Sequence, residues 1–298
     1  MSKIPNASET VPEAKQQKKR SRFGEIVHSI KRNKSAVAGL IIIALLLLIL
    51  IGSLFIKYET VTATSTANRF RTPDLEFPFG GDNMGRNVFL RTIYGSRYSL
   101  SIGFLAAAIS TVLGVFLGSL AGYYGGLVDD IIMRASDVLA SIPGMLLGMV
   151  IITVLGQSLQ NLIIAVGVTG VPIFVRITRA SVLTIKNQEY VEASRAIGMS
   201  HLRVIFTQVL PNGLSPIIVT FTSSLGLSII VAASLSFLGF GVPVPKPEWG
   251  TLVSAGRNYI RTSPNLMSFP GLFIMITVLA FNLLGDGLRD ALDPKLKK

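Results

Sequence analysis

Five long stretches of this sequence contain no aspartate, glutamate, lysine or arginine, and they constrain the fold more than any other feature. A helix needs about 20 mostly apolar residues to cross the hydrocarbon core of a bilayer. Every one of the stretches reaches that length: they are 36–56, 98–126, 138–175, 204–245 and 262–285. A soluble domain needs charge spread over its surface, so the sequence predicts an all-α integral membrane protein.

The stretches divide into six predicted transmembrane helices. A polar turn at residues 156–158 splits the stretch 138–175 into two crossings, and the stretch 204–245 holds one crossing with a flanking loop. The predicted spans are 37–56, 99–122, 135–155, 160–177, 214–238 and 267–286. They imply an N-terminal tail (1–36), a loop (57–98), a five-helix core (99–287) that includes a second loop (178–213), and a C-terminal tail (288–298).

The charge distribution predicts how these helices are oriented. The chain carries a net charge of +12, and basic residues gather just before the first span, at Lys15, Lys18, Lys19, Arg20, Arg22, Lys31, Arg32 and Lys34. Cytoplasmic flanks collect basic residues, so we expect both termini to be cytoplasmic. The first apolar span is longer than the core of a signal peptide and is interpreted as a retained anchor. No aromatic-studded basic groove accompanies the charge, which argues against a nucleic-acid partner.

Just before the first span, the apolar residues Phe23, Ile26, Val27 and Ile30 recur at helical spacing. This pattern predicts a basic amphipathic helix lying on the membrane face. The alternative is a solvated leader.

Two further patterns concern packing. Gly114, Gly118 and Gly122 form a doubled small-xxx-small repeat, which lets helix backbones approach closely and favours a packed bundle. The proline-rich segment 239–261 continues into helical spacing from Trp249. It predicts a short external helix that caps the bundle, with Trp249 at the membrane interface.

The sequence offers no catalytic or cofactor site of its own. It contains no phosphate-binding loop, no G-x-S-x-G nucleophile motif, no cysteine, and only His28 and His201 without metal-ligand spacing. We therefore expect no catalytic residue, no metal and no cofactor in this chain, so any energy source is expected in another subunit. The predicted spans also lack carboxylates at mid-height, which disfavours an ion-coupled carrier. A membrane enzyme lacks any nucleophile–base set.

The predicted loop at 178–213 is the most informative segment. Residues 189–197 favour a short helix, and Gly198 is suited to end it as a C-cap in the left-handed conformation. Ser200 is suited to be the N-cap of a second helix, which is expected to end before Pro211. Two short helices would form a knob with a mixed surface that suits a partner groove: Arg195, Ile197, Met199, His201 and Leu202. The alternative is an ordinary amphipathic linker.

This loop resembles the signature of the inner-membrane permease subunits of binding-protein-dependent ABC importers. The matching positions are Glu192, Ala193, Ser194, Gly198, Ile205, Leu210 and Pro211, with Ser194 in place of the family's second alanine. The resemblance implies a coupling helix that sits in a cleft of an ATPase subunit, with Glu192 as a polar anchor and Gly198 as the turn. Arg195, Met199 and His201 belong to the same predicted contact.

Four more segments narrow the resemblance to the C-type subunit of the dipeptide/oligopeptide permease family: 81–89, 121–126, 236–241 and 282–290. The resemblance covers roughly residues 23–295 and implies the fold of a type I ABC importer permease in the bacterial cytoplasmic membrane. The implied partners are a second homologous permease, two ATP-binding subunits that hold ATP and Mg, an extracytoplasmic binding protein and a peptide substrate.

Two points stay open at the level of sequence. Nickel or metal-chelate importers and glutathione importers belong to the same branch, so the substrate is implied only as a class. Near the C-terminus, Asp286 and Arg289 are expected to form an inner-face ion pair that helps to set a gate, with an ordinary surface pair as the alternative.

Overall fold

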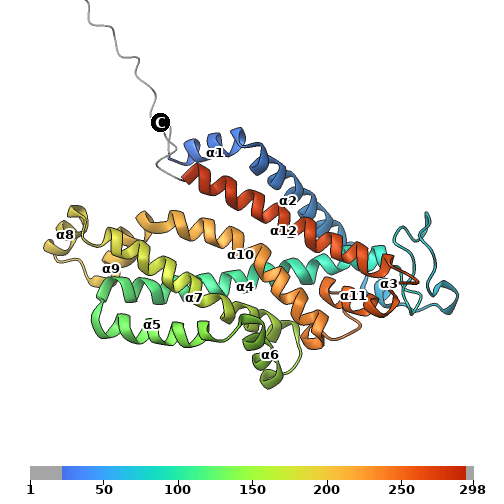
Figure 1. The fold of residues 1–298 in the computed structure, drawn as a ribbon. Helices are drawn as coiled ribbons and strands as arrows, with labels where there is room; N and C mark the ends of the chain where they lie inside the picture. The colour runs from blue at the N-terminus through green and yellow to red at the C-terminus, as the bar shows by residue number, and fades with distance from the viewer. Residues whose placement is uncertain (1–21, 293–298) are drawn as a thin grey trace, which may run out of the picture.

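The computed structural model describes residues 22–292, and within that range the chain forms helices without strands. The long helices run side by side in an elongated bundle, with α8 and α9 at one end and α3 and α11 at the other (Figure 1). The helices are α1 (Arg22–Arg32), α2 (Lys34–Ser53), α3 (Tyr58–Thr62), α4 (Val88–Tyr124), α5 (Gly126–Ser141), α6 (Gly144–Leu155), α7 (Leu159–Ile185), α8 (Glu189–Ala196), α9 (His201–Val204), α10 (Leu214–Leu235), α11 (Trp249–Gly256) and α12 (Asn265–Leu292).

Five helical runs in the described residues are long and apolar enough to cross a membrane: α2, α4, α7, α12 and the run His201–Phe240 that contains α10. The pair α5 and α6 makes a sixth if it is counted as one span, bent by 91°. The all-α membrane fold is therefore confirmed. The span expected at 135–155 is divided between the end of α5 and α6. Proline at 143 forces the preceding Ile142 into an extended conformation (φ −91°, ψ 127°), and this ends α5.

The helix α4 begins at Val88, where residue 99 was expected, because its two arginines satisfy their charges inside the protein. Arg91 is 2% exposed and donates to the carbonyl oxygen of Val61 over 2.9 Å. The guanidinium of Arg97 lies 4.0 Å from the ring centroid of Tyr94 and bonds the end of α2 through the Ser53 hydroxyl. A rule that stops a span at the first charge cannot foresee such partners.

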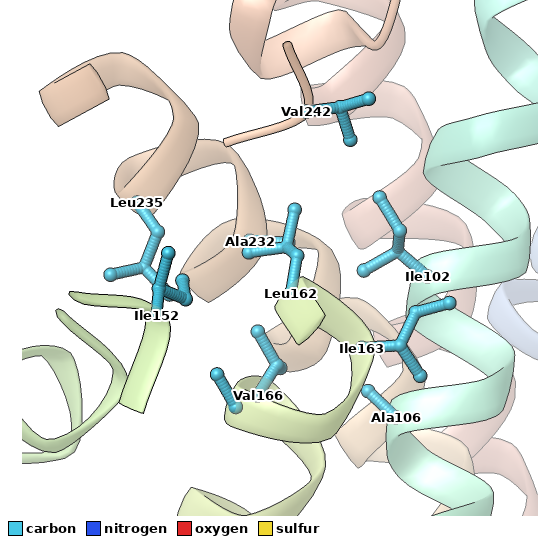
Figure 2. Close-up of a cluster of buried hydrophobic side chains, with 10 residues drawn as sticks. Ile102, Ala106, Ile152, Leu162, Ile163, Val166, Ala232, Leu235 and Val242 are labelled. Carbon is cyan, nitrogen blue, oxygen red and sulfur yellow. The ribbon is translucent and has the colours of Figure 1, made fainter. Parts of the chain in front are cut away.

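Glycines hold α4 against α7, as the small-residue repeat predicted. A Cβ atom on Gly118 would lie 2.5 Å from the carbonyl oxygen of Val175 and 2.8 Å from Cβ of Thr178. Gly114 and Gly122 face α7 in the same way. Beside this contact lies a buried apolar cluster to which α4, α6, α7 and α10 contribute; Figure 2 shows Ile102, Ala106, Ile152, Leu162, Ile163, Val166, Ala232, Leu235 and Val242.

The first predicted span, α2, lies along α12 (Figure 1). Asn33 fixes the junction with α1: its Oδ1 accepts from the N–H of Ala36 over 3.1 Å and caps α2, while its Nδ2 donates to Oδ2 of Asp290 over 3.0 Å. The helix α1 forms where the amphipathic pattern predicted it. The side chains of Phe23, Ile26 and Val27 and the tail 1–21 lie outside the described residues.

At the opposite end, α11 forms as predicted, and the side chain of Trp249 lies inside the protein. Its side chain is fully buried and donates through Nε1 to the carbonyl oxygen of Thr92 over 2.8 Å. Gly95 leaves space for the ring, since a Cβ there would lie 3.0 Å from Cδ1 of Trp249. The buried carboxylate of Glu248 caps α11 by accepting from the N–H groups of Gly250 and Thr251, both over 2.8 Å. Trp249 and Glu248 therefore attach α11 to α4 and close the loop that precedes it.

Candidate functional site

The segment between α7 and α10 folds into a knob, residues 186–213, at one end of the bundle (Figure 1). Its first helix, α8, ends at Ala196, and Gly198 follows with φ +83°, as the sequence predicted. The N–H of Gly198 bonds the carbonyl oxygen of Arg195 over 2.9 Å, which closes the helix. A Cβ at Gly198 would have no neighbour within 4 Å, so the glycine is required by backbone conformation and not by space.

The second helix of the knob differs from the prediction. Ser200 occupies the N-cap position of α9, but its side chain makes no capping bond, and α9 is a single turn. The helix then continues through a π-helical turn at residues 205–209 and a 3₁₀ turn at 210–213 into α10, so Pro211 does not end it. The change from π to 3₁₀ hydrogen bonding places Pro211 at the start of a new helical segment. The N–H groups at the start of a helical segment have no partner within it, so proline can stand there without the loss of a hydrogen bond.

The inner face of the knob is apolar and is buried against α4 and α7. Val191, Val204, Ile205 and Val209 pack with Val182, Ile185 and Tyr123. Ile205 is fully buried, and the hydroxyl of Ser194 donates within α8 to the carbonyl oxygen of Tyr190 over 2.8 Å. Both residues match the family signature, and the structure places them inside the chain. Ile205 holds the knob to the bundle. The side chain of Ser194 is small and makes its hydrogen bond within α8, so α8 can pack closely against the bundle.

Tyr123, at the C-terminal end of α4, ties the two knob helices together. Its hydroxyl accepts from Nε of Arg195 in α8 over 3.1 Å and lies 3.1 Å from Nδ1 of His201 in α9. The Arg195 guanidinium also lies 4.8 Å from the centroid of the Tyr123 ring, an attractive cation–π geometry. At the start of the knob, Nζ of Lys186 donates to the carbonyl oxygen of Gly122 in α4 over 2.8 Å.

Reasoning from sequence missed Tyr123 and Lys186 as parts of this site. The signal was present, because an aromatic pair, Tyr123-Tyr124, stands at the end of a span immediately before two glycines. The function of the pair depends on contacts across more than 70 residues of sequence, and those contacts follow from the fold alone.

The outer face of the knob is exposed and mixes charge with large apolar side chains. Ile197 is 79% exposed and Leu202 is 54% exposed. Of the other predicted contact residues, Glu192, Ala193, Arg195, Gly198, His201 and Pro211 are exposed, and Met199 and Leu210 are half-buried. Apolar groups in such a setting gain free energy when another protein covers them, so this face has the composition of a docking surface.

The predicted ion pair between Asp286 and Arg289 is not formed, since neither residue takes part in any ion pair found within residues 22–292. Both side chains are exposed, where an ion pair gains little over hydration and costs side-chain entropy. The acid of this helix that is bonded is Asp290, to Asn33.

Two other ion pairs, which the sequence did not predict, clamp α5 onto α7. Arg179 holds Asp129 with two bonds, from Nε to Oδ1 and from Nη2 to Oδ2, both of 2.6 Å. Nη2 of Arg176 lies 2.8 Å from Oδ1 of Asp137. The first pair is partly buried and bidentate, which is the geometry in which arginine binds a carboxylate most strongly.

We expect Tyr123→Phe to loosen the knob without unfolding the bundle. The ring and its packing remain, and Nη2 of Arg195 keeps its bond to the carbonyl oxygen of Lys186, but Nε of Arg195 loses its acceptor. A hydrogen bond to a charged group contributes about 1.5–3 kcal/mol. Limited trypsin digestion in detergent should therefore cut after Arg195 and Arg203 several-fold faster than in the wild type. Tyr124→Phe is the matched control, because the Tyr124 hydroxyl makes no hydrogen bond with the described residues. Equal cleavage of all three proteins would contradict the role of the phenol.

Comparison with known proteins agrees with this architecture. Residues 114–298 match the family model described as "Binding-protein-dependent transport system inner membrane component", and residues 21–73 match "N-terminal TM domain of oligopeptide transport permease C". Among solved structures, the inward-facing MetNI methionine ABC transporter shares the fold, with a TM-score of 0.56 and 20% identity. The alignment covers 68% of this chain and 96% of that one.

Curated relatives cover nearly the whole chain. The dipeptide transport system permease protein DppC of Alkalihalophilus pseudofirmus is 44% identical over 277 residues, which are 93% of this chain and 91% of that protein. The oligopeptide transport system permease protein OppC of Bacillus subtilis is 42% identical, covering 90% and 88%. The glutathione transport system permease protein GsiD of Escherichia coli O6:K15:H31 is 41% identical, covering 98% and 96%. The chain therefore belongs to the family of binding-protein-dependent transport system inner membrane components.

Proposed function

We propose that this chain is the permease subunit of an ATP-driven importer and forms half of the path by which di- or oligopeptides cross the bacterial cytoplasmic membrane. The knob carries the proposal. It is a folded structure with an exposed apolar and charged face, attached to a bundle whose sequence contains no phosphate-binding loop. A second, homologous permease would complete the path, and an extracytoplasmic binding protein would deliver the substrate.

The attachment of the knob supports a rigid transfer of motion. Two ATP-binding subunits would hold ATP and Mg, and one of them would seat the outer face of the knob in its cleft. The Tyr123 hydroxyl joins α8 and α9 to α4. The glycines of α4 in turn let its backbone lie directly against α7. A displacement of the knob would therefore move α4 and α7 together. Nucleotide binding can shift the bundle between two states only if the ATPase contacts the knob differently in each.

This mechanism requires the knob and both termini to face the cytoplasm. The basic residues before α2 favour that orientation. Six crossings, with α5 and α6 counted as one bent span, would also return the C-terminus to the side of the N-terminus.

The peptide substrate rests on the relatives named for dipeptides and oligopeptides. Glutathione is a second candidate, because permeases named for glutathione are 38% to 41% identical over at least 96% of this chain. We favour peptides, since the relative with the highest identity of those compared is named for dipeptides.

The test is reconstitution of the complete importer in vesicles with its partner permease, ATPases and binding protein. We expect ATP-dependent accumulation of L-alanyl-L-alanine that stops when the binding protein is omitted. Accumulation of glutathione but not of the dipeptide would transfer the assignment to glutathione. Uptake by this chain alone, without ATPase subunits, would overturn the proposal.

Glu192→Lys should weaken retention of the ATPase subunits in detergent. Glu192 is exposed on α8 in the proposed contact, and reversing a charge in a complementary interface costs affinity through like-charge repulsion. Pull-down through a tag on this chain should recover at least about tenfold less ATPase, the effect of roughly 1.4 kcal/mol. Glu59→Lys makes the same charge change on exposed α3 at the opposite end of the bundle and should leave recovery unchanged. Unchanged recovery and uptake with Glu192→Lys would remove that residue from the contact.

A further inference from the structure

A recess of about 380 Å³ lies among α4, α6, α7 and α10; its surface is mainly apolar, and several hydroxyl groups contribute to it. The hydroxyl recess contains six of them: Ser110, Thr169, Thr220, Ser223, Ser224 and Ser228. The remaining lining side chains are apolar or glycine, and no ionisable group contributes. In a bundle surrounded by lipid, such a concentration of polar groups in a cavity is a candidate binding site.

The hydroxyl recess lies at mid-height in the bundle. Ser110 stands near the middle of α4 (Val88–Tyr124), Thr169 near the middle of α7 (Leu159–Ile185), and Ser224 near the middle of α10 (Leu214–Leu235). A substrate that crosses between the two ends of these helices must pass this level.

Five of the hydroxyls direct their protons to backbone carbonyls and so keep lone pairs for a ligand. Ser110 donates to the carbonyl oxygen of Gly167 over 2.6 Å, and Thr220 donates to that of Pro216 over 2.9 Å. Thr169, Ser223 and Ser224 bond carbonyl oxygens of their own helices in the same way. A hydroxyl has one proton and two acceptor lone pairs, so these groups are acceptors toward the recess.

Ser228 is the exception and points to a ligand. Its side chain is 92% buried, being 8% exposed, and lines the hydroxyl recess. Its hydroxyl makes no hydrogen bond to any of the described residues. This hydroxyl is therefore free to donate to a ligand that accepts a hydrogen bond at this position.

A second recess also borders α10. It has a volume of about 440 Å³, is mainly apolar, and extends between α10 and α11 toward the end of the bundle opposite the knob. Met145, in the first turn of α6, lines both recesses and therefore lies between them. Methionine side chains adapt to ligands of different shape, which suits a junction that many substrates pass.

We propose that the hydroxyl recess binds the main chain of the transported peptide, with Ser228 donating to a peptide carbonyl and the other hydroxyls accepting from peptide N–H groups. The proposal rests on the function proposed above. Uncharged donors and acceptors match the one feature that all peptides share, their backbone, and favour no particular side chain. The recess therefore provides for broad peptide specificity in this half of the path.

The first test is Ser228→Ala in the reconstituted importer, with L-alanyl-L-alanine as the probe. We expect uptake at subsaturating peptide to fall about threefold to tenfold, the effect of one hydrogen bond. Thr222→Val is the matched control. Thr222 is also buried in α10, at 5% exposure, but its hydroxyl bonds the carbonyl oxygen of Ile218 and it does not line the recess.

The second test does not depend on activity. The chain contains no cysteine, so Ser228→Cys introduces its only thiol, and alkylation by N-ethylmaleimide can be followed by the mass of this subunit. We expect L-alanyl-L-alanine to slow alkylation at least about threefold during turnover, with no such protection for Thr222→Cys. Normal wild-type uptake together with unchanged Ser228→Ala uptake, or with unprotected Ser228→Cys, would overturn the recess alone. Absence of peptide uptake by the wild type would overturn the proposed function as well.

Discussion

Gly198→Val is expected to reduce ATP-dependent peptide uptake at least tenfold while the membrane helices stay folded. Gly198 has φ +83°, a conformation that costs an ordinary residue about 1–2 kcal/mol and a β-branched one more. Apart from its chain neighbours, none of the residues in 22–292 has an atom within 4 Å of a Cβ at this position, so crowding contributes nothing. The strain is relieved only if the chain rotates out of the left-handed region, and this changes the angle between α8 and α9. The knob would then no longer fit its partner.

Gly198→Asn is the matched control, because asparagine adopts the left-handed conformation more readily than other non-glycine residues. Its uptake should lie between the wild type and Gly198→Val. ATP hydrolysis per peptide transported separates loss of coupling from loss of the complex, and we expect that ratio to rise for Gly198→Val. Wild-type uptake by Gly198→Val would show that the turn is dispensable.

Gly118→Leu should destabilise the whole permease. Even the first side-chain atom would lie 2.5 Å from the carbonyl oxygen of Val175, and backbone cannot move aside without separating α4 from α7. Overpacking of this kind costs about 1–3 kcal/mol even where neighbours can adjust. We expect a lower midpoint of thermal unfolding and an aggregated fraction on gel filtration in detergent.

Gly271→Leu is the control for the same change in helix propensity and hydrophobicity. Gly271 lies inside α12, and a Cβ there would have no neighbour within 4 Å. Its unfolding midpoint should match that of the wild type. Equal midpoints for the two variants would mean that the α4–α7 contact can open without loss of stability.

Prediction from sequence succeeded where a local property decides the outcome. The absence of charge over about 20 residues identifies a membrane helix, because such an apolar segment is favourable in lipid whatever its neighbours are. The left-handed turn at Gly198 was also predictable, since only its own backbone conformation is involved. The glycine repeat of α4 predicted close packing for the same reason, although it did not name α7 as the partner.

Two of the predictions failed because contacts between residues far apart in sequence decided the outcome. The start of α4 at Val88 depends on remote carbonyls that satisfy Arg91, and the burial of Trp249 depends on the space that Gly95 leaves in another helix. Pro143 is a different case, because its effect on Ile142 is local and could have been foreseen from the sequence.

The amino-acid sequence by itself determined that the chain is a helical membrane protein with a structured loop between two of its spans. The tertiary structure decided how that loop is held and what the spans enclose. Tyr123 meets Arg195 and His201, and Ser228 faces a recess with serines and threonines of three helices, only after helices far apart in sequence have packed together. The physical reason is that a hydrogen bond or a cavity belongs to a pair or group of elements, whereas burial in lipid acts on each helix separately.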